Sequence, residues 1–215
     1  PSAPATSATT AVGTAYTVTP SNAVGTGNLG LYNFSYVAFN GVVTARSLTV
    51  TALNQTKTYG TAISSAAVLN TNYTVSGLMS GDAVNTPTFT FSGSPAGNLA
   101  TAGEGTYSIT PGNISLTSGN PAFYNIIYTA GTLTVNKASL TVNATALTKR
   151  YGTTASTTGV FGTTFSVTGL LNADAASTCS LSYSGTPAAN TAFALPAVYT
   201  VTPSEVVFSS GTSAT

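Results

Sequence analysis

The sequence Ser-Leu-Thr-Val-Thr-Ala at residues 47–52 returns as Ser-Leu-Thr-Val-Asn-Ala at residues 139–144, a shift of 92 positions. At the same shift, Lys-Thr-Tyr-Gly-Thr at residues 57–61 returns as Lys-Arg-Tyr-Gly-Thr at residues 149–153. Similarity at a fixed period indicates an array of repeated structural units rather than one large domain. The sequence therefore predicts tandem repeats of about 92 residues.

A third copy of the repeat is divided between the two ends of the sequence. Tyr-Thr-Val-Thr-Pro at residues 16–20 matches Tyr-Ser-Ile-Thr-Pro at residues 107–111 and Tyr-Thr-Val-Thr-Pro at residues 199–203. We therefore expect three segments, which are the C-terminal half of a repeat at residues 1–46, a complete repeat at residues 47–138, and a repeat that lacks its final strands at residues 139–215.

Each repeat contains short segments in which apolar residues alternate with Thr, Ser or Asn. Such alternation, rich in β-branched and aromatic residues, is typical of strands with one buried and one solvated face. Clusters of Asn, Gly, Pro and Ser between the segments indicate turns. We expect strands in the complete repeat at residues 48–52, 73–75, 88–91, 107–110, 124–128 and 133–135. The predicted fold class is all-β, with tandem immunoglobulin-like β-sandwich repeats, and with β-grasp-like repeats as the alternative.

Charge is scarce in this sequence. Charged residues make up 4% of the 215 residues, and the formal net charge is +1. A net charge near zero promotes association between protein copies. Five basic residues are too few to neutralise the row of phosphates that a nucleic-acid-binding protein contacts, and no apolar run reaches the roughly 18 to 20 residues of a membrane span. The expected partners are therefore other copies of the chain or adjacent repeats of the same chain.

Residues able to perform catalysis are few. The sequence contains no histidine, the commonest general base, and its four acidic residues are Asp82, Glu104, Asp174 and Glu205. Asp82 and Asp174 occupy equivalent positions in successive repeats, so their recurrence is a property of the repeat and does not indicate a catalytic pair. We expect no enzymatic activity, no cofactor and no metal site.

Two charged residues recur with the repeat. The interval between Lys57 and Asp82 equals the interval between Lys149 and Asp174. We expect a structural ion pair in each repeat, because a chain with few charges keeps these four at equivalent positions. An exposed pair of this kind contributes about 0–1 kcal/mol to stability. Bridging by calcium is the alternative, although calcium requires several oxygen ligands clustered on one loop.

A tyrosine followed by glycine also recurs, as Tyr59-Gly60 and Tyr151-Gly152. Recurrence with the repeat favours a core or turn position in which the tyrosine hydroxyl group is hydrogen-bonded. The alternative is a surface on which an exposed ring stacks against a sugar. Because the sequence has no tryptophan, which glycan-binding modules use above all, glycan binding is the weaker interpretation.

Five short motifs occur in a fixed order in the complete repeat. They are Leu-Thr-Val-x-Ala at 48–52, Lys-x-Tyr-Gly at 57–60, Gly-Leu-x-x-x-Asp at 77–82, Gly-Thr-Tyr-Ser-Ile-Thr at 105–110 and Tyr-x-x-x-Tyr-x-x-Gly-Thr-Leu-Thr-Val at 124–135. This pattern resembles the MBG/YDG-type tandem β repeats of large bacterial surface proteins. The resemblance implies a secreted, adhesin-like or haemagglutinin-like protein at the bacterial cell surface, without catalytic activity. One departure is that Thr61 and Thr153 replace the aspartate that commonly follows Tyr-Gly in the family.

Residues 139–215 contain no counterpart of residues 124–135, whereas residues 32–44 are similar to that segment. A domain without its final strands exposes an unpaired sheet edge. One hypothesis is that residues 32–44 of one copy complete the 139–215 domain of a neighbour by strand addition, with an interface formed by Tyr32, Phe34, Tyr36, Val42 and Val43. The alternative is that the sequence is a window of a longer tandem array, in which the chain continues into its own closing strand.

Both hypotheses predict an extracellular structural protein, which is either a subunit of a self-assembling filament or a segment of a surface stalk. Strand addition that does not close into a ring would join copies head to tail. Two alternatives of a different class are an adhesin whose repeats bind a glycan or a host surface, and a fibre protein of a phage or virus. A distinct tip domain would favour the adhesin, whereas filaments formed by purified subunits would favour the structural polymer.

Overall fold

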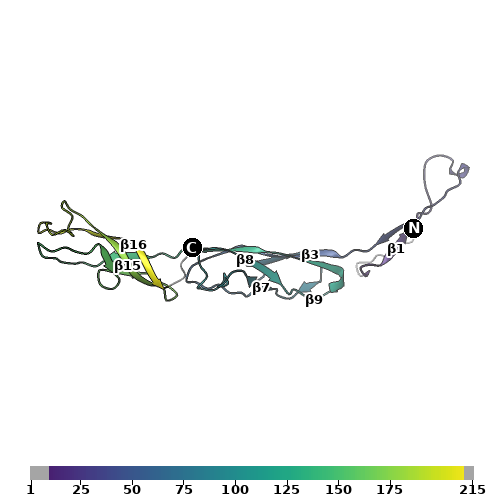
Figure 1. The fold of residues 1–215 in the computed structure, drawn as a ribbon. Coiled ribbons are helices and arrows are strands. Elements are labelled where there is room, and N and C mark those ends of the chain that lie inside the picture. Colours follow the sequence, from purple (N-terminus) through teal and green to yellow (C-terminus); the bar gives the residue numbers. More distant parts are fainter. Residues whose placement is uncertain (1–9, 211–215) are drawn as a thin grey trace. The chain divides into compact units, whose positions relative to one another are not determined.

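The computed structural model describes residues 10–210, in which the regular structure is almost entirely β-strand (Figure 1). The all-β prediction is therefore confirmed. No helix in this part of the chain is long and apolar enough to cross a membrane. The strands are β1 (Ala15–Val18), β2 (Phe39–Val42), β3 (Arg46–Ala52), β4 (Gln55–Thr58), β5 (Tyr73–Ser76), β6 (Ala83–Val84), β7 (Thr88–Phe91), β8 (Gly105–Gly112), β9 (Leu116–Ser118), β10 (Tyr124–Thr129), β11 (Gly131–Asn136), β12 (Thr141–Ala144), β13 (Thr158–Val160), β14 (Phe165–Thr168), β15 (Ala175–Tyr183) and β16 (Val201–Ser210), and the short 3-10 helices are η1 (Leu29–Leu31) and η2 (Pro121–Phe123).

The described residues divide into two compact units. One unit consists of the residues up to 53 together with 66–90 and 110–131, and the other consists of 54–65, 91–109 and the residues from 132 onward. This division passes through the predicted complete repeat at residues 47–138. The boundaries of the repeats therefore stay a prediction.

In the first unit, β3 lies at the centre of a three-stranded sheet with the order β10–β3–β5. β10 runs parallel to β3, with Tyr124 opposite Arg46, and β5 runs antiparallel along the other edge. Leu48 and Val50 of β3 are fully buried. The alternation in the sequence at residues 48–52 thus places the apolar side chains on one face of the strand, as the two-residue period of a strand requires.

A second sheet has the order β4–β11–β8–β7. β11 runs parallel to β4, with Leu133 opposite Gln55, and Leu133, Val135 and Ile109 are buried in the core. In both parallel ladders, each residue pairs with the residue 78 positions earlier in the chain. The first and last strands of the complete repeat are therefore paired in parallel in both ladders.

Parallel ladders distinguish the complete repeat from an immunoglobulin domain, whose two sheets are antiparallel. Parallel strands need a long crossover between them, and the chain from β5 to β9 provides this crossover. The sheets are consistent with the predicted β-sandwich. The immunoglobulin-like strand order is not confirmed, and the β-grasp-like alternative stays open.

The strands of residues 139–215 repeat part of this arrangement. β12 pairs antiparallel with β14, as β3 does with β5, and a further sheet has the order β13–β15–β16. Phe165, Ala176, Cys179 and Leu181 form the buried core, and burial raises the pKa of the Cys179 thiol. Within residues 10–210, no strand pairs with the edge of β12 that corresponds to the β10 edge of β3.

Gly131, the first residue of β11, lies against the backbone that follows β3. A Cβ atom at this position would lie 2.6 Å from the carbonyl oxygen of Ala52 and 2.9 Å from that of Leu53. We expect Gly131→Ala to lower the free energy of unfolding by about 1–3 kcal/mol, because the backbone must move to admit the methyl group. Urea denaturation of the purified chain measures this change.

Gly103→Ala is the matched control. A Cβ atom at Gly103 would have no non-adjacent heavy atom within 4 Å. We expect its free energy of unfolding to stay within about 0.5 kcal/mol of the original value. Equal effects of the two substitutions would contradict the close approach of Gly131 to the backbone of residues 52 and 53.

Candidate functional site

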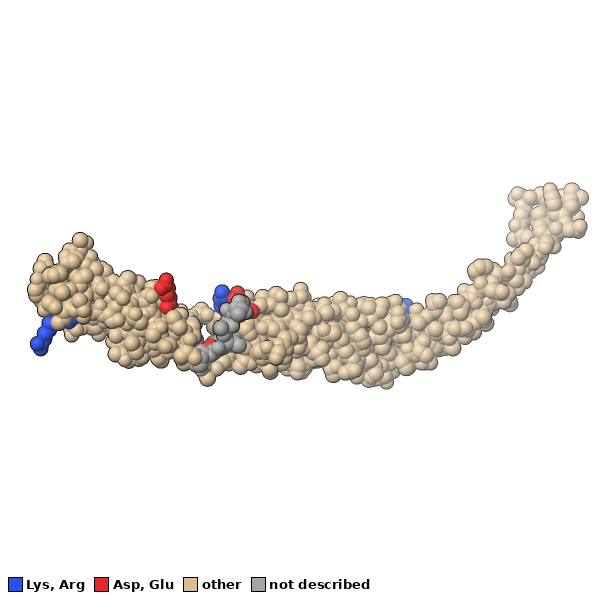
Figure 2. Space-filling view, in the orientation of Figure 1, with Lys and Arg blue, Asp and Glu red and all other residues tan. Residues whose placement is uncertain are grey.

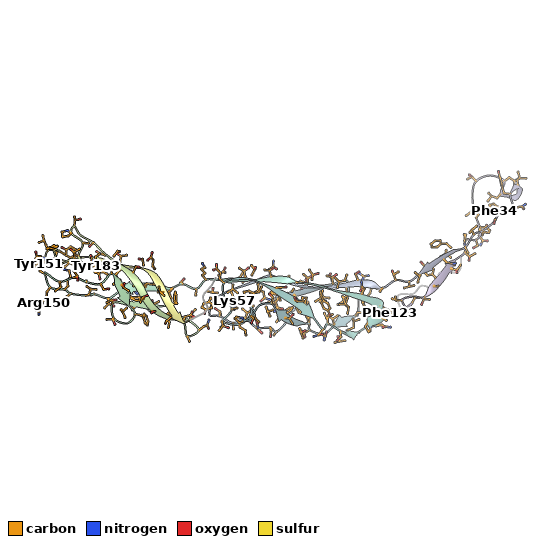
Figure 3. The ribbon with its side chains drawn as sticks, viewed as in Figure 1. Phe34, Lys57, Phe123, Arg150, Tyr151 and Tyr183 are labelled. Carbon is orange, nitrogen blue, oxygen red and sulfur yellow. The ribbon has the colours of Figure 1, made fainter. Side chains whose placement is uncertain are left out.

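Lys57 in β4, labelled in Figure 3, is buried, with 6% of its surface exposed. The ammonium group donates one hydrogen bond to the carbonyl oxygen of Thr61, at 3.1 Å, and another to the carbonyl oxygen of Leu99. Burial lowers the pKa of Lys57, because desolvation disfavours the charged form. The lysine therefore links the turn at residues 58–61 to the segment at residues 98–100.

Lys149 makes the equivalent contacts in the last repeat. Its ammonium group donates to the carbonyl oxygen of Thr153 at 3.2 Å and to that of Thr191 at 2.8 Å. These acceptors lie 92 positions after the acceptors of Lys57. The same lysine-stabilised turn is thus formed twice in the chain.

The predicted ion pairs Lys57–Asp82 and Lys149–Asp174 are not formed in the described residues. Both lysines bond to backbone carbonyl groups instead. A buried ammonium group needs several acceptors around it, and carbonyl oxygens supply them without the desolvation of a second charge. The recurrence of these lysines therefore reflects a turn-stabilising role and not a partnership with the aspartates.

Both aspartates accept hydrogen bonds from tyrosine hydroxyl groups. Asp82 accepts from Tyr124 in the last strands of its own repeat. Asp174 accepts from Tyr59, which belongs to the preceding repeat. The hydrogen bond to Asp82 is the main cause that raises the pKa of the Tyr124 hydroxyl, since it favours the protonated form of the phenol.

The turn at Tyr59-Gly60 requires glycine at its second position. Gly60 has a φ of +85°, a left-handed conformation that other residues rarely adopt. Its amide donates to the carbonyl oxygen of Ala100 at 3.0 Å. Gly152 has the same φ, and its amide donates to the carbonyl oxygen of Ala192 at 3.0 Å. The Tyr-Gly motif therefore specifies one backbone geometry in both repeats.

The Gly-Leu-x-x-x-Asp motif forms a loop that also occurs twice. Gly77 and Gly169 begin the two loops with φ of +96° and +98°. A Cβ atom at either position would lie 2.1 or 2.5 Å from a backbone oxygen. At the other end of each loop, the aspartate amide donates to the carbonyl oxygen three residues earlier, at 3.1 and 2.8 Å. The loops at residues 77–82 and 169–174 thus share the glycine at one end and the aspartate hydrogen bond at the other, whereas the positive φ of Asn172 has no counterpart at Ser80.

The Tyr59-Gly60 turn contacts the loop at residues 169–174, and we call this contact the repeat junction. The Tyr59 hydroxyl group donates to the Asp174 carboxylate, at 3.1 Å from one oxygen and 3.3 Å from the other. The side-chain amide of Asn172 donates to the carbonyl oxygen of Ala100 at 2.8 Å. Two motifs that each occur once per repeat therefore meet across consecutive repeats.

An apolar contact completes the repeat junction. A Cβ atom at Gly60 would lie 2.3 Å from Cδ1 of Leu171, so the leucine occupies the space that a side chain at position 60 would fill. Residues of the turn are less exposed where the repeat junction forms. Tyr59 and Gly60 are half-buried, whereas Tyr151, which is equivalent to Tyr59, is 64% exposed. Figure 3 places Tyr151 in the loops at the end of the last repeat.

The residues predicted to form a donated strand lie in the first segment of the chain. Tyr32, Phe34, Tyr36 and Val42 are exposed, and the rings of Phe34 and Tyr36 stack with their centroids 6.3 Å apart. Val43 is half-buried, and its backbone is hydrogen-bonded to residues 13 and 14. Exposure of these side chains does not test strand donation, which stays a prediction.

The contacts of Lys57 generate a prediction about stability. We expect Lys57→Met to lower the free energy of unfolding by about 1–2 kcal/mol, because two carbonyl oxygens lose their donor while the side-chain volume is kept. Lys137→Met is the control, since Lys137 forms an exposed ion pair with Glu104 at 3.2 Å and such pairs contribute little. Urea denaturation compares the two variants, and an equal loss in both would contradict the role given to Lys57.

The hydrogen bond between Tyr59 and Asp174 generates a second prediction. We expect Tyr59→Phe to speed hydrogen exchange of the amides at residues 170–174 by about 2- to 10-fold, because a charge-assisted hydrogen bond at a half-exposed site contributes about 0.5–1.4 kcal/mol. Tyr151→Phe in dilute protein is the matched control and should leave these amides unchanged. Mass spectrometry reads the exchange, and unaltered rates in Tyr59→Phe would show that the bond does not hold the loop.

Comparison with known proteins agrees with the order of the motifs. The family model of the MBG domain (YGX type) matches residues 48–134, a range that begins in β3 and ends in β11. Neither the curated proteins nor the solved structures contain a match to the chain. Tyr59-Gly60-Thr61 fits the YGX type, and MBG domains occur in bacterial surface proteins. The segment at residues 48–134 thus matches the MBG domain of the YGX type.

Proposed function

We propose that the chain is a segment of an extracellular stalk or filament on a bacterial surface, in which MBG repeats are joined in series as a mechanical spacer. The observation that carries this proposal is the repeat junction between Tyr59 and Asp174. Both residues belong to motifs that occur once per repeat, so the same contact can join any number of repeats. This role is structural and does not involve catalysis.

The composition of the surface supports a structural role. Lysine, arginine, aspartate and glutamate are sparse on the face of the molecule in Figure 2, in line with a charged fraction of 4%. Low net charge removes the electrostatic repulsion that keeps copies of a soluble protein apart. A chain of this composition is suited to close lateral or end-to-end packing.

The parallel ladders suit a domain that carries tension. In each ladder, the first strand begins at one end and the last strand finishes at the opposite end, because the two strands run in the same direction. Tension applied at these two points shears all hydrogen bonds of the ladder together. A hairpin pulled from its open end would instead lose its hydrogen bonds one at a time.

Single-molecule force spectroscopy tests this mechanical role. Attachment at residues 46 and 136 applies shear to the ladders, whereas attachment at residues 46 and 124 pulls on the same end of the β3–β10 pair. We expect shear to require the higher unfolding force and to lengthen the chain by about 300 Å. Equal forces in the two geometries would contradict the proposed mechanical spacer.

A finer proposal concerns how copies join, namely that residues 32–44 of one copy pair with β12 of a neighbour. The exposed aromatic side chains of Tyr32, Phe34 and Tyr36 support it, as does the edge of β12 that has no paired strand within residues 10–210. In the complete repeat, Ile126 of β10 lies opposite Leu48 of β3. Phe34 lies 92 positions before Ile126, and Leu140 lies 92 positions after Leu48, so we expect Phe34 of one copy to lie opposite Leu140 of its neighbour. Strand addition of this kind derives affinity from main-chain hydrogen bonds.

A cysteine pair at Phe34 and Leu140 tests strand donation. In a Cys179→Ala background, Phe34→Cys combined with Leu140→Cys should give a ladder of disulfide-linked multimers on a non-reducing gel, because opposite residues of paired strands approach within disulfide distance. Val24→Cys combined with Leu140→Cys is the control, since Val24 is exposed and lies outside the donated segment. Absence of the ladder, or an equal ladder in the control, would contradict donation.

A further inference from the structure

The turn at Tyr151-Gly152 has the same geometry as the turn that receives a loop in the repeat junction. Lys149 stabilises it through two carbonyl oxygens, and the amide of Gly152 donates to Ala192 at the distance found for Gly60 and Ala100. The carbonyl oxygen of Ala100 also accepts from a side-chain amide of the docked loop. The receiving surface in the last repeat is therefore already formed.

The surroundings of this turn are more apolar than those of the occupied turn. Phe193 and Leu195, which follow Ala192, are 73% and 68% exposed. The equivalent positions in the complete repeat, 92 residues earlier, are Thr101 and Gly103. The ring of Tyr151 is exposed as well, so the turn and the segment to which it is hydrogen-bonded carry three exposed apolar or aromatic side chains.

The chain contains a second loop that matches this surface. The loop at residues 77–82 shares the first glycine and the aspartate hydrogen bond of the docked loop, and Met79 and Ser80 are exposed in it. The central turns differ in one residue, because Asn172 has a φ of +50° whereas Ser80 has no positive φ. Met79 is equivalent to Leu171, and Ser80 is equivalent to Asn172. The Tyr124 hydroxyl group donates to Oδ2 of Asp82, and a carboxylate has enough lone pairs to accept a second hydroxyl group.

We propose that the loop at residues 77–82 of a second copy of this chain docks on the Tyr151-Gly152 turn. The Tyr151 hydroxyl group donates to Asp82 of that copy, and Met79 packs over Gly152. This contact rests on the proposed joining of repeats in series, and it identifies the surface through which one copy holds the next. In a filament made by strand donation, the donated residues 32–44 and the docked loop come from the same copy.

Sedimentation equilibrium of the full chain tests the proposal through self-association. Tyr151→Phe removes the donor to Asp82, so we expect the association constant to fall about 3- to 10-fold. Ser80→Asn copies the amide of Asn172 and should donate to Ala192, so we expect the constant to rise about 3- to 10-fold. Tyr59→Phe is the control, because Tyr59 is already engaged within the chain, and it should leave the constant unchanged.

The association constants of these variants either support or contradict the proposed docking. Unchanged association in both Tyr151→Phe and Ser80→Asn would overturn the docking, even if the Phe34–Leu140 disulfide forms and strand donation holds. A chain that stays monomeric at every concentration would also overturn it, and the turn would then be available only to another repeat of the same polypeptide. The force measurement on residues 46–136 is independent of both results, so the mechanical role can fail or hold separately.

Discussion

The complete repeat depends on the parallel pairing of its first and last strands. Parallel neighbours cannot be joined by a tight turn, so the chain between β4 and β10 must leave the ladder and return to it. Those intervening strands carry buried side chains of their own, including Tyr73 and Phe89, whose rings lie edge to face. Loss of either ladder would therefore separate the two ends of the repeat from the core between them.

Much of the fold could be predicted from the sequence because strand periodicity is a local property. The expected strands at residues 48–52, 73–75 and 88–91 correspond to β3, β5 and β7 within one or two residues. The pairing of β3 with β10 could not be predicted in the same way. Alternation determines which face of a strand is buried, whereas the neighbouring strand is selected by contacts between residues 78 positions apart.

The repeat junction escaped prediction for a related reason. Tyr59 and Asp174 each belong to a motif that recurs once per repeat, and so do Lys57 and Asp82. Periodicity therefore cannot distinguish partners in the same repeat from partners in consecutive repeats. The sequence does carry a chemical signal for the repeat junction. Gly60 permits another segment to approach the backbone closely, and the hydroxyl group of Tyr59 can donate a hydrogen bond to the carboxylate of Asp174. The buried Lys57 gave no such signal, because its acceptors are backbone carbonyl groups that every residue carries.

The repeat junction has a consequence for how such a protein changes during evolution. Each repeat carries the receiving turn and the docking loop, and neither half is specific to a position along the chain. Unequal recombination between two copies of the coding repeat joins the front of one to the back of another at equivalent positions. The product still contains one turn and one loop per repeat, so whole repeats can be gained or lost without any compensating substitution at the contact.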